Sequence, residues 1–504
     1  MTTLPSGLPV VVERADPVPL AVQISAQLEA AVTDGLLHAG DRLPSSRDLA
    51  VSLGVSRTVV TNAYARLFAE GWLEGRHGSG TYVADVVAPA AVPRGSHRPV
   101  AARPDATAPT AAARPGPPVP TAAPAQTPAG LNETGGRPAP IDLQPGISWA
   151  EGIEPPAWRR AWRQAGAHLP SRWPDPYGLP ELREAIAAYL RRSRGLAVGP
   201  EQVLITQGVS SGLALLADVL LALGDRAGIE EPGYPTGREV LRRAGAQVVP
   251  CPVDAHGLVP EELPDDLRLL YATPAHQYPL GGRLPVNRRQ ALIGWARATG
   301  AIIVEDDYDS EFRYDVGPLP ALHSMDPDVI VYLGTASKVL ATAFGAGWLV
   351  APPALVDQLA ALRPRLGVRI PEPVQHAILA LLRSGDLERH IRKMRLEYGR
   401  RRAALVDGLT RAGRDTAGPG PDPAPFRLLG DTAGKHVVLE FPADFPVGRL
   451  IDAAAERGVA VYPLDRYFAG KPTMNGLIVG YGTATLPQIR RAAAELALLL
   501  RRCR

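Results

Sequence analysis

The residue of this chain most suited to covalent chemistry is Lys338, because lysine is rare here. The 504 residues include four lysines, at positions 338, 393, 435 and 471. Lys338 follows an apolar run, Val329 to Leu333, and a turn of small residues that carries two hydroxyls, Thr335 and Ser337. An amine in a dry pocket has a lowered pKa and can attack a carbonyl carbon to form a Schiff base. The alternative is an exposed loop lysine, the usual place for a charged side chain.

A second reactive group lies upstream, where another apolar run ends in carboxylates. Ala301 to Val304 is followed by Glu305, Asp306, Asp307, Tyr308 and Asp309. In an open α/β sheet the ligand crevice lies at the carboxyl ends of the strands. There Asp306 could pair with a protonated pyridine nitrogen, and Tyr308 with the phenolic oxygen of the ring. Taken alone, these acids also suit a solvated loop or a divalent-metal site. Beside Lys338 they indicate pyridoxal 5'-phosphate.

Other residues could complete such a site. Gln207 to Gly212 reads QGVSSG and opens an apolar helix, so its backbone N–H groups, with Ser210 and Ser211, form a candidate phosphate cup. Gly-Ser turns of this kind are also common without a ligand. His276, Gln277 and Tyr278 lie on the loop after LLYATP and are expected to line the same crevice.

The elements that must position these residues alternate along the chain from Gln202. Short buried strands such as VLIT, AIIVEDD and VIVYLG are separated by helices such as GLALLADVLLAL and RRQALIGWARATG. Repeated alternation of strand and helix predicts a mostly parallel sheet that is covered on both faces.

Residues 10–85 have a different pattern, that of a winged helix-turn-helix. Leu20 to Leu37 has apolar residues at helical spacing, SRDLAVSL can be capped by Ser45 or Ser46, and Ser56 can cap RTVVTNAYARLFAEG. WLEGRHGSGTYVA then reads as strand, glycine-rich turn and strand, which predicts a wing. In a helix-turn-helix the second helix enters the major groove with its N-terminal residues leading.

The overall charge of this module argues against DNA binding. Residues 1–85 contain six Arg against nine Asp and Glu, which makes them net negative by three. The basic residues nevertheless lie on the predicted reading face, whereas several acids lie on the first helix or its flanks. Because phosphate affinity depends on the local footprint, we expect DNA binding. A winged helix that binds another protein is the alternative.

Motifs along nearly the whole chain resemble one family. YGLPELREAIAAYL, EEPGYP, TPAHQYPLGG, EDDYDSEFRYD and GTASK resemble the fold-type-I aminotransferase module in order and spacing, and LPSSRDLA, LGVSRTVV and GWLEGRHGSGTYV resemble the GntR winged helix. The combination is similar to the MocR (GabR-like) regulators outside residues 86–138. It implies a GntR-type winged helix at 10–85. At 139–504 it implies an α/β fold-type-I PLP-dependent aminotransferase-like domain with a smaller α+β C-terminal domain, about 400–504.

The resemblance also implies roles for individual residues. Lys338 would form the Schiff base, and Tyr234 in EEPGYP would stack on the ring; an ordinary turn aromatic is the alternative for Tyr234. The residues expected to hold the cofactor are Lys338, Asp306, Tyr308, Tyr234, Ser210, Ser211, Thr335, Ser337 and His276. Those expected to face DNA are Arg47, Ser56, Arg57 and Thr58, with His77 and Gly78 at the wing tip near the minor groove.

Several positions depart from the family pattern, among them Gly345, Trp173 and Ile478. Gly345 stands where an arginine usually binds the cofactor phosphate, and Trp173 stands where a tyrosine would reach the phosphate of a partner subunit. Because losing a charge-assisted contact weakens binding roughly tenfold to hundredfold, we expect weaker cofactor binding than is usual. Ile478 lies near the position where such aminotransferases hold an amino acid carboxylate with an arginine, which counts against efficient transamination.

The remaining features concern the linker and the compartment. Residues 86–138 are rich in Ala, Pro and Thr with almost no large apolar residue, so we expect a disordered, extended tether. Two cysteines, the absence of a signal-peptide pattern and apolar runs too short to span a bilayer predict a soluble, cytoplasmic protein without a membrane partner. A net charge of +3 does not indicate a partner.

Together these features predict a transcriptional regulator that binds double-stranded operator DNA as a homodimer. Its aminotransferase-like domain would bind pyridoxal 5'-phosphate at Lys338 and sense an amino-acid-like or vitamin B6 effector. Two alternatives stay open: a working aminotransferase that carries a DNA-binding module, and a regulator whose second domain has lost the cofactor.

Overall fold

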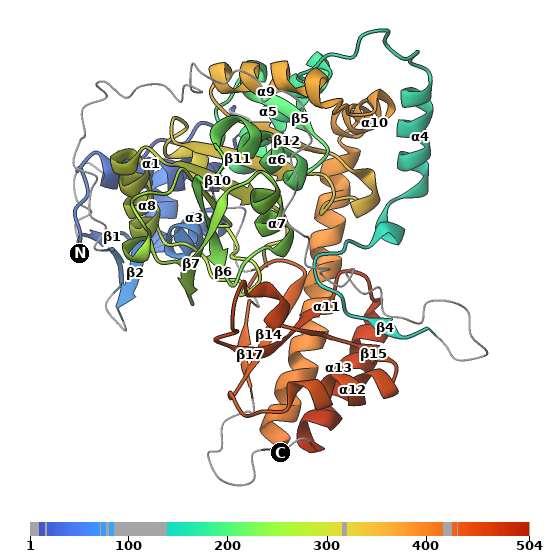
Figure 1. Cartoon of the computed structure of the whole chain (residues 1–504). Helices are drawn as coiled ribbons and strands as arrows, with labels where there is room; N and C mark the ends of the chain where they lie inside the picture. Colours follow the sequence, from blue (N-terminus) through green and yellow to red (C-terminus); the bar gives the residue numbers. More distant parts are fainter. Residues whose placement is uncertain are drawn as a thin grey trace.

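The computed structural model describes residues 10–15, 18–70, 72–76, 80–84, 139–314, 320–416, 426–430 and 432–502. The predicted linker at 86–138 and the predicted wing-tip residues His77 and Gly78 lie outside these residues. Figure 1 shows three parts: an N-terminal domain in blue, a large domain whose sheet is green to yellow and whose helices include the teal α4 and the orange α9 and α10, and a smaller domain mainly in orange and red.

The N-terminal domain is a winged helix. Its elements are α1 (Leu20–Thr33), β1 (Arg42–Leu43), α2 (Ser46–Leu53), α3 (Arg57–Glu70), β2 (Leu73–Arg76) and β3 (Gly80–Val83). The three strands form an antiparallel sheet in the order β1-β3-β2. The Ser45 hydroxyl caps α2 by accepting from the N–H of Asp48 at 3.2 Å, which satisfies an N–H that has no partner within the helix. Helix α1 ends at Thr33, before the predicted Leu37, and Gly35 follows in the left-handed region with φ 73°.

The core of the winged helix reaches the large domain. Ile24 and Leu28 of α1 pack with Val60 and Leu67 of α3, and all four are fully buried. The same cluster includes Val286, the first residue of α8 in the large domain. The winged helix therefore rests on the large domain through apolar contact as well as being joined to it along the chain.

The large domain is built on an eight-stranded sheet in the order β5-β12-β11-β10-β9-β6-β7-β8. The strands are β5 (Val203–Thr206), β6 (Arg226–Glu231), β7 (Gln247–Asp254), β8 (Gly257–Leu258), β9 (Leu269–Ala272), β10 (Ile302–Asp307), β11 (Ile330–Thr335) and β12 (Gly347–Val350). β7, β6, β9, β10 and β11 are parallel, whereas β12 runs antiparallel to β11 and β5. The chain reaches β12 without a crossover helix, and only an antiparallel neighbour can be joined so directly.

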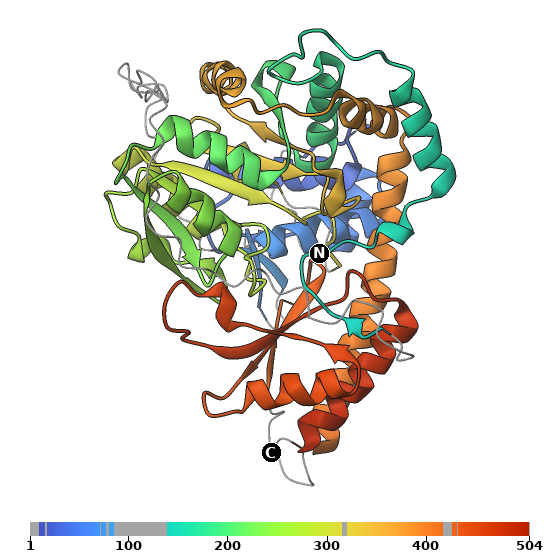
Figure 2. The same cartoon turned by 45° about the vertical axis from the view of Figure 1, so that its right-hand side comes forward.

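Helices cover both faces of this sheet, as predicted. The helices are α4 (Pro155–Gly166), α5 (Pro180–Arg194), α6 (Val209–Leu220), α7 (Pro235–Arg243), α8 (Val286–Thr299), α9 (Pro353–Leu366) and α10 (Glu372–Arg383). Neighbouring residues of a strand point to opposite faces, so Val331 belongs to a core cluster with residues of α6, α7 and α9, while Tyr332 belongs to a cluster with residues of α5 and α10. Helix α4 packs on α10 at the outside of the domain (Figure 2).

The smaller domain combines a four-stranded sheet, in the order β13-β14-β17-β16, with three helices. Its elements are α11 (Asp386–Thr416), β13 (Arg427–Leu429), β14 (His436–Phe441), α12 (Val447–Glu456), β15 (Val459–Ala460), β16 (Tyr462–Pro463), β17 (Asn475–Gly480) and α13 (Leu486–Arg502). Helix α11 runs from the large domain down into the smaller one (Figures 1 and 2). Strand β4 (Ile141–Asp142), just after the predicted linker, pairs with β15, so the small domain also takes in chain outside the predicted range of about 400–504.

None of the described helices has the length and apolar character needed to cross a membrane.

Candidate cofactor site and DNA-binding face

Parallel pairing of β10 and β11 brings the two predicted reactive groups together. Asp306 lies opposite Leu333, and Asp307 opposite Gly334, so both strands end at the same edge of the sheet. Asp306 and Asp307 are the last two residues of β10 at this edge, and the turn that carries Lys338 follows β11. Ligands bind at the carboxyl ends of strands in open α/β sheets, and the site lies there.

The side chain of Lys338 is largely withdrawn from solvent. Its Nζ donates a hydrogen bond of 2.5 Å to the carbonyl oxygen of Gly146. Burial lowers the pKa of the Lys338 ammonium, because the charged form loses hydration, while Asp306 and Asp309 oppose this shift. A lowered pKa leaves more of the amine neutral near pH 7, and the neutral amine is the nucleophilic form.

Asp306 lines the cavity, and its two carboxylate oxygens differ in their contacts. Its Oδ2 accepts a hydrogen bond from the phenol of Tyr271 on β9, whereas its buried Oδ1 has no hydrogen-bond partner among the described residues. Burial raises the pKa of Asp306 to about 7, and the Tyr271 hydrogen bond acts in the opposite direction. A cationic ring nitrogen opposite Oδ1 would satisfy this oxygen and favour the ionised carboxylate. The residues present therefore fit a pyridinium ring.

The other end of the cavity is suited to a phosphate. Gly208, with φ 117°, precedes α6, so the first N–H groups of that helix face the cavity beside Ser210. Thr335 and Ser337 line the same end, and the Thr335 hydroxyl accepts from the N–H of Ser337 at 3.0 Å. Gly345 also lines this end, and a Cβ added there would meet no atom within 4 Å. The place of the family's arginine is therefore open space.

The cavity has a volume of about 240 Å³ and brings most of the predicted cofactor residues together. Its predicted lining residues are Lys338, Asp306, Tyr308, Tyr234, Ser210, Thr335, Ser337 and Tyr278. Gln277, which was predicted with Tyr278, is buried and is not among the lining residues. Further lining residues include Gly146 and Thr273. Gly146 is distant in the chain, so no local pattern points to it, whereas Thr273 follows a predicted strand end at the crevice.

Two predicted cofactor residues, His276 and Ser211, are not among the lining residues. His276 is buried behind Tyr308, whose hydroxyl lies 2.9 Å from Nδ1 of the imidazole. The same Nδ1 lies 3.1 Å from Oδ1 of Asp309. His276 therefore contacts the site through Tyr308. Ser211 is one residue beyond Ser210 on α6, and the turn of the helix carries its side chain away from the cavity.

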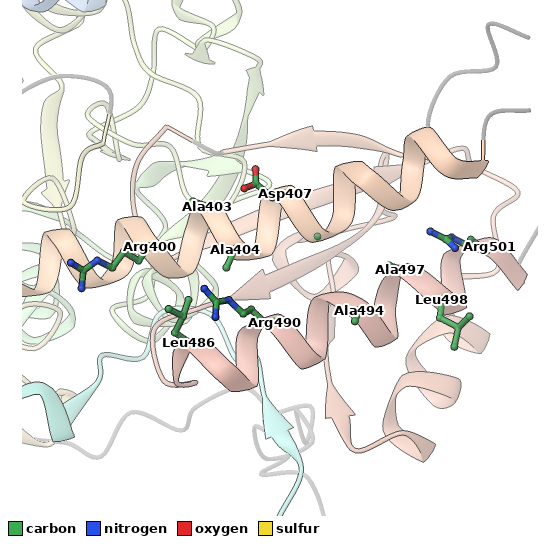
Figure 3. A pocket seen from close by; sticks show the side chains of 11 residues that line it. Arg400, Ala403, Ala404, Asp407, Leu486, Arg490, Ala494, Ala497, Leu498 and Arg501 are labelled. Atoms are coloured by element: carbon green, nitrogen blue, oxygen red, sulfur yellow. The ribbon is translucent and has the colours of Figure 1, made fainter. Parts of the chain in front are cut away.

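A larger groove lies elsewhere, between α11 and α13 of the small domain (Figure 3). It has a volume of about 1050 Å³ and is lined mainly by alanine, leucine and arginine side chains. Asp407 is the one carboxylate among its lining residues, and the groove contains neither a lysine nor a hydroxyl. Its composition lacks the nucleophile and the phosphate-binding groups of the cavity at Lys338.

The described residues that were predicted to face DNA lie on the outer side of the helix-turn-helix. Arg47, Ser56, Arg57 and Thr58 are exposed at the starts of α2 and α3. Nε of Arg57 donates to the Ser46 hydroxyl at 3.2 Å, which orients the guanidinium. Arg42 lines a groove between these helices and the wing strand β3. Arg42 was not among the residues predicted to face DNA.

Trp173, which stands where a tyrosine was expected to reach a partner subunit's phosphate, lies on the loop between α4 and α5 and is 81% exposed.

Comparison with protein families matches both parts of the chain. Residues 147–456 match the model described as aminotransferase class I and II, and residues 20–83 match bacterial regulatory proteins of the gntR family. The gntR match covers α1, α2, α3 and the wing strands. The aminotransferase match contains Lys338, Asp306 and every other residue of the cavity except Gly146.

Relatives with the same two-part organisation match over almost their full length. The chain is 36% identical to the HTH-type pyridoxine biosynthesis transcriptional regulator PdxR of Corynebacterium glutamicum, over 98% of each chain. It is 34% identical to the probable rhizopine catabolism regulatory protein MocR of Rhizobium meliloti, over 94% of this chain and 92% of that one.

Among solved structures, an archaeal alanine:glyoxylate aminotransferase matches 72% of this chain and 91% of its own, with a TM-score of 0.66 and 25% identity. An α-aminoadipate aminotransferase from Thermus thermophilus, solved with N-(5'-phosphopyridoxyl)-L-leucine, covers 72% of this chain and 92% of its own. Its TM-score is 0.64 at 25% identity.

Proposed function

The chain belongs to the MocR-like branch of the GntR-type transcriptional regulators, and we propose that its aminotransferase-like domain binds pyridoxal phosphate at Lys338 as a sensor. The observation that carries this proposal is that Lys338 and Asp306 line one cavity, in which the amine is largely withdrawn from solvent and Oδ1 of Asp306 has no partner among the described residues. When bound, pyridoxal phosphate supplies an aldehyde whose condensation with the amine forms a carbon–nitrogen double bond and releases water.

In this proposal one end of the cavity binds the pyridine ring and the other end binds the phosphate. Oδ1 of Asp306 would face the ring nitrogen, and Tyr308 would donate its hydroxyl proton to the phenolic oxygen of the ring. His276 would support Tyr308 from behind by donating its Nδ1 proton, a tautomer that its contact with Asp309 favours. The start of α6, with Ser210, Thr335 and Ser337, would hold the phosphate without help from a guanidinium.

The ligand that is sensed is a vitamin B6 compound in this proposal, not an amino acid. Among the described residues that line the cavity, Lys338 is the only basic side chain. Ile478, at the position expected for a carboxylate-binding arginine, is fully buried in the small-domain sheet. An amino acid carboxylate would thus lack a cationic partner in the lining, whereas pyridoxal phosphate uses the groups that are present. The name of the pyridoxine biosynthesis regulator supports the same ligand class.

DNA binding in this proposal uses the exposed starts of α2 and α3. Arg47, Arg57 and Arg42 would contact operator phosphates or base edges, and Thr58 would lie at the start of the recognition helix. A ligand at Lys338 can change DNA affinity only if it binds two arrangements of the protein with different affinity. We further propose that the regulator acts as a homodimer, since operators of helix-turn-helix proteins usually contain two half-sites.

The test is to titrate the purified protein with pyridoxal phosphate, reduce the mixture with borohydride, and map the modified peptide by mass spectrometry. We expect the mass increase on the peptide that contains Lys338, and none in Lys338→Ala. Operator binding should then change with added pyridoxal phosphate and not with amino acids. Absence of modification at Lys338 at saturating ligand would instead favour a domain that has lost the cofactor. Steady turnover of an amino acid and a keto acid would favour an enzyme.

A further inference from the structure

A second buried lysine, Lys435, lies against the main chain of Lys338. Its side chain is only 2% exposed, and its Nζ donates to the Lys338 carbonyl oxygen at 2.8 Å and to the Ser148 hydroxyl at 2.7 Å. No described carboxylate lies within ion-pair distance of this amine. Asp309 and Glu311 act on it only at longer range. A buried amine loses hydration, and here no ion pair compensates, so the burial of Lys435 lowers the folding stability. Its position therefore needs an explanation.

Ser148 completes the arrangement. Its hydroxyl donates to the Lys338 carbonyl oxygen at 2.7 Å, so this oxygen accepts from both Ser148 and Lys435. A carbonyl oxygen has two lone pairs, and here both are occupied. At the other end of the same residue, Nζ of Lys338 donates to Gly146. Lys338 is therefore held at its main chain and at its amine by neighbouring residues of one segment.

Both donors belong to the small domain. Lys435 directly precedes β14, and its carbonyl oxygen accepts from the N–H of Tyr481. The segment that carries Ser148 begins with β4, which pairs with β15, and its Leu143 carbonyl accepts from the N–H of Gly480 at 2.7 Å. The turn of Lys338, by contrast, follows β11 of the large domain. The contacts to the Lys338 carbonyl thus join the two domains at the candidate cofactor site.

We propose that Lys435 is a positioning residue, which acts with Ser148 to fix the main chain of Lys338 to the small domain. The proposal rests on the proposed attachment of pyridoxal phosphate at Lys338. A fixed main chain keeps the amine aimed at the aldehyde, so affinity for the cofactor depends on Lys435 although Lys435 does not touch it. Through the same contacts, a ligand bound at Lys338 stabilises the segment 139–149, which directly follows the linker to the winged helix.

The test compares Lys435→Met with wild type. Methionine fills a similar volume without a buried charge, so we expect the melting temperature of the unloaded protein to stay the same or rise. The dissociation constant for pyridoxal phosphate, measured by absorption titration, should increase about tenfold. Lys393→Met is the matched control, because Lys393 is half exposed and pairs with Glu154 at the surface. It should change the dissociation constant by less than roughly twofold.

Ser148→Ala tests the same contacts independently, because it removes the other donor to the Lys338 carbonyl oxygen. Because Ser148 and Lys435 share the Lys338 carbonyl, the double variant should weaken binding by less than the product of the two single effects. Amide hydrogen exchange should show that pyridoxal phosphate protects residues 139–149 in wild type and protects them less in Lys435→Met.

The outcomes separate this inference from the proposed function. If wild type is modified at Lys338 but Lys435→Met and Ser148→Ala both bind as wild type does, the positioning role is wrong and the cofactor site stands. Multiplicative effects in the double variant would also overturn the shared contact. If wild type itself is not modified at Lys338, both proposals fail.

Discussion

The phenol of Tyr271, at the carboxyl half of β9, donates a hydrogen bond to Oδ2 of Asp306 at the end of the neighbouring strand β10. This contact orients the carboxylate, whose other oxygen, Oδ1, has no hydrogen-bond partner among the described residues. It also opposes the effect of burial on the Asp306 pKa. The ability of Asp306 to stay ionised opposite a ring nitrogen therefore depends on a residue in the adjacent strand.

Tyr271→Phe should weaken pyridoxal phosphate binding about tenfold, because the carboxylate loses a donor that favours its ionised form. The dissociation constant from absorption titrations reports the effect. The unloaded variant should also lose about 1 to 3 kcal/mol of folding free energy, since Oδ2 is left buried without its donor. Tyr332→Phe, which removes a phenol from Asp307 outside the cavity, is the control for general loss of a buried hydroxyl. Equal ligand affinity in wild type and Tyr271→Phe would contradict the orienting role.

The raised pKa of Asp306 predicts that the ionised carboxylate, which favours pyridoxal phosphate binding, lowers folding stability as the pH rises. Its folded-state pKa of about 7 lies above the ordinary value of 3.8, so the folded chain holds this proton more tightly than the unfolded chain does. The resulting stability is present below the ordinary pKa and is lost as the pH rises through about 7. Asp306→Asn removes this loss. Without ligand, the free energy of unfolding of Asp306→Asn minus that of wild type should therefore increase by on the order of 1 to 3 kcal/mol between about pH 4 and pH 8.

Chemical denaturation of both proteins across this pH range measures the difference. The other buried carboxyls with raised pKa values, Glu230, Glu305 and Glu311, are common to both proteins, so the difference isolates Asp306. Parallel stability profiles would be inconsistent with a titrating Asp306. At the same time, Asp306→Asn should bind pyridoxal phosphate at least about tenfold more weakly, because a neutral amide cannot pair with a cationic ring nitrogen.

Gly345→Arg should strengthen cofactor binding. The site has open space at this position, and a guanidinium on the phosphate would add a charge-assisted contact, so affinity should rise about tenfold. Because Gly345 has φ 56°, a residue with a Cβ there should lower folding stability by about 1 kcal/mol. Gly345→Ala carries the same backbone strain without the guanidinium. A gain in affinity in the alanine variant as well would show that the charge is not its source.

Arg57→Ala should weaken operator binding and reduce the slope of log affinity against log salt by about one, as expected for loss of one phosphate contact. Fluorescence anisotropy with labelled operator DNA over a range of salt concentrations measures both quantities. Arg243→Ala, which removes an exposed arginine paired with Glu239 on α7, is the control and should leave the slope unchanged. If the slope of Arg57→Ala matches wild type, Arg57 does not contact phosphate.

The sequence by itself indicated which residues would meet at the cavity. Asp306 lies at the end of a buried strand and Tyr308 and Lys338 follow such strands, and parallel strands that alternate with helices end at one edge of a sheet. Ser210 opens an apolar helix at the same edge. These placements depend on local patterns, which are readable along the chain. The winged helix was readable for the same reason, since caps, glycine stops and helical spacing are local signals.

Only the tertiary structure decided how those side chains are held. His276 lies behind Tyr308 rather than in the cavity, because the fold of its loop and the contact with Asp309 set its direction. Tyr271 reaches Asp306 from the next strand, a contact that depends on strand register. Gly146, Ser148 and Lys435 approach Lys338 from positions 192, 190 and 97 residues away along the chain. Contacts across such separations depend on how two domains pack, and periodicity within a segment carries no information about that.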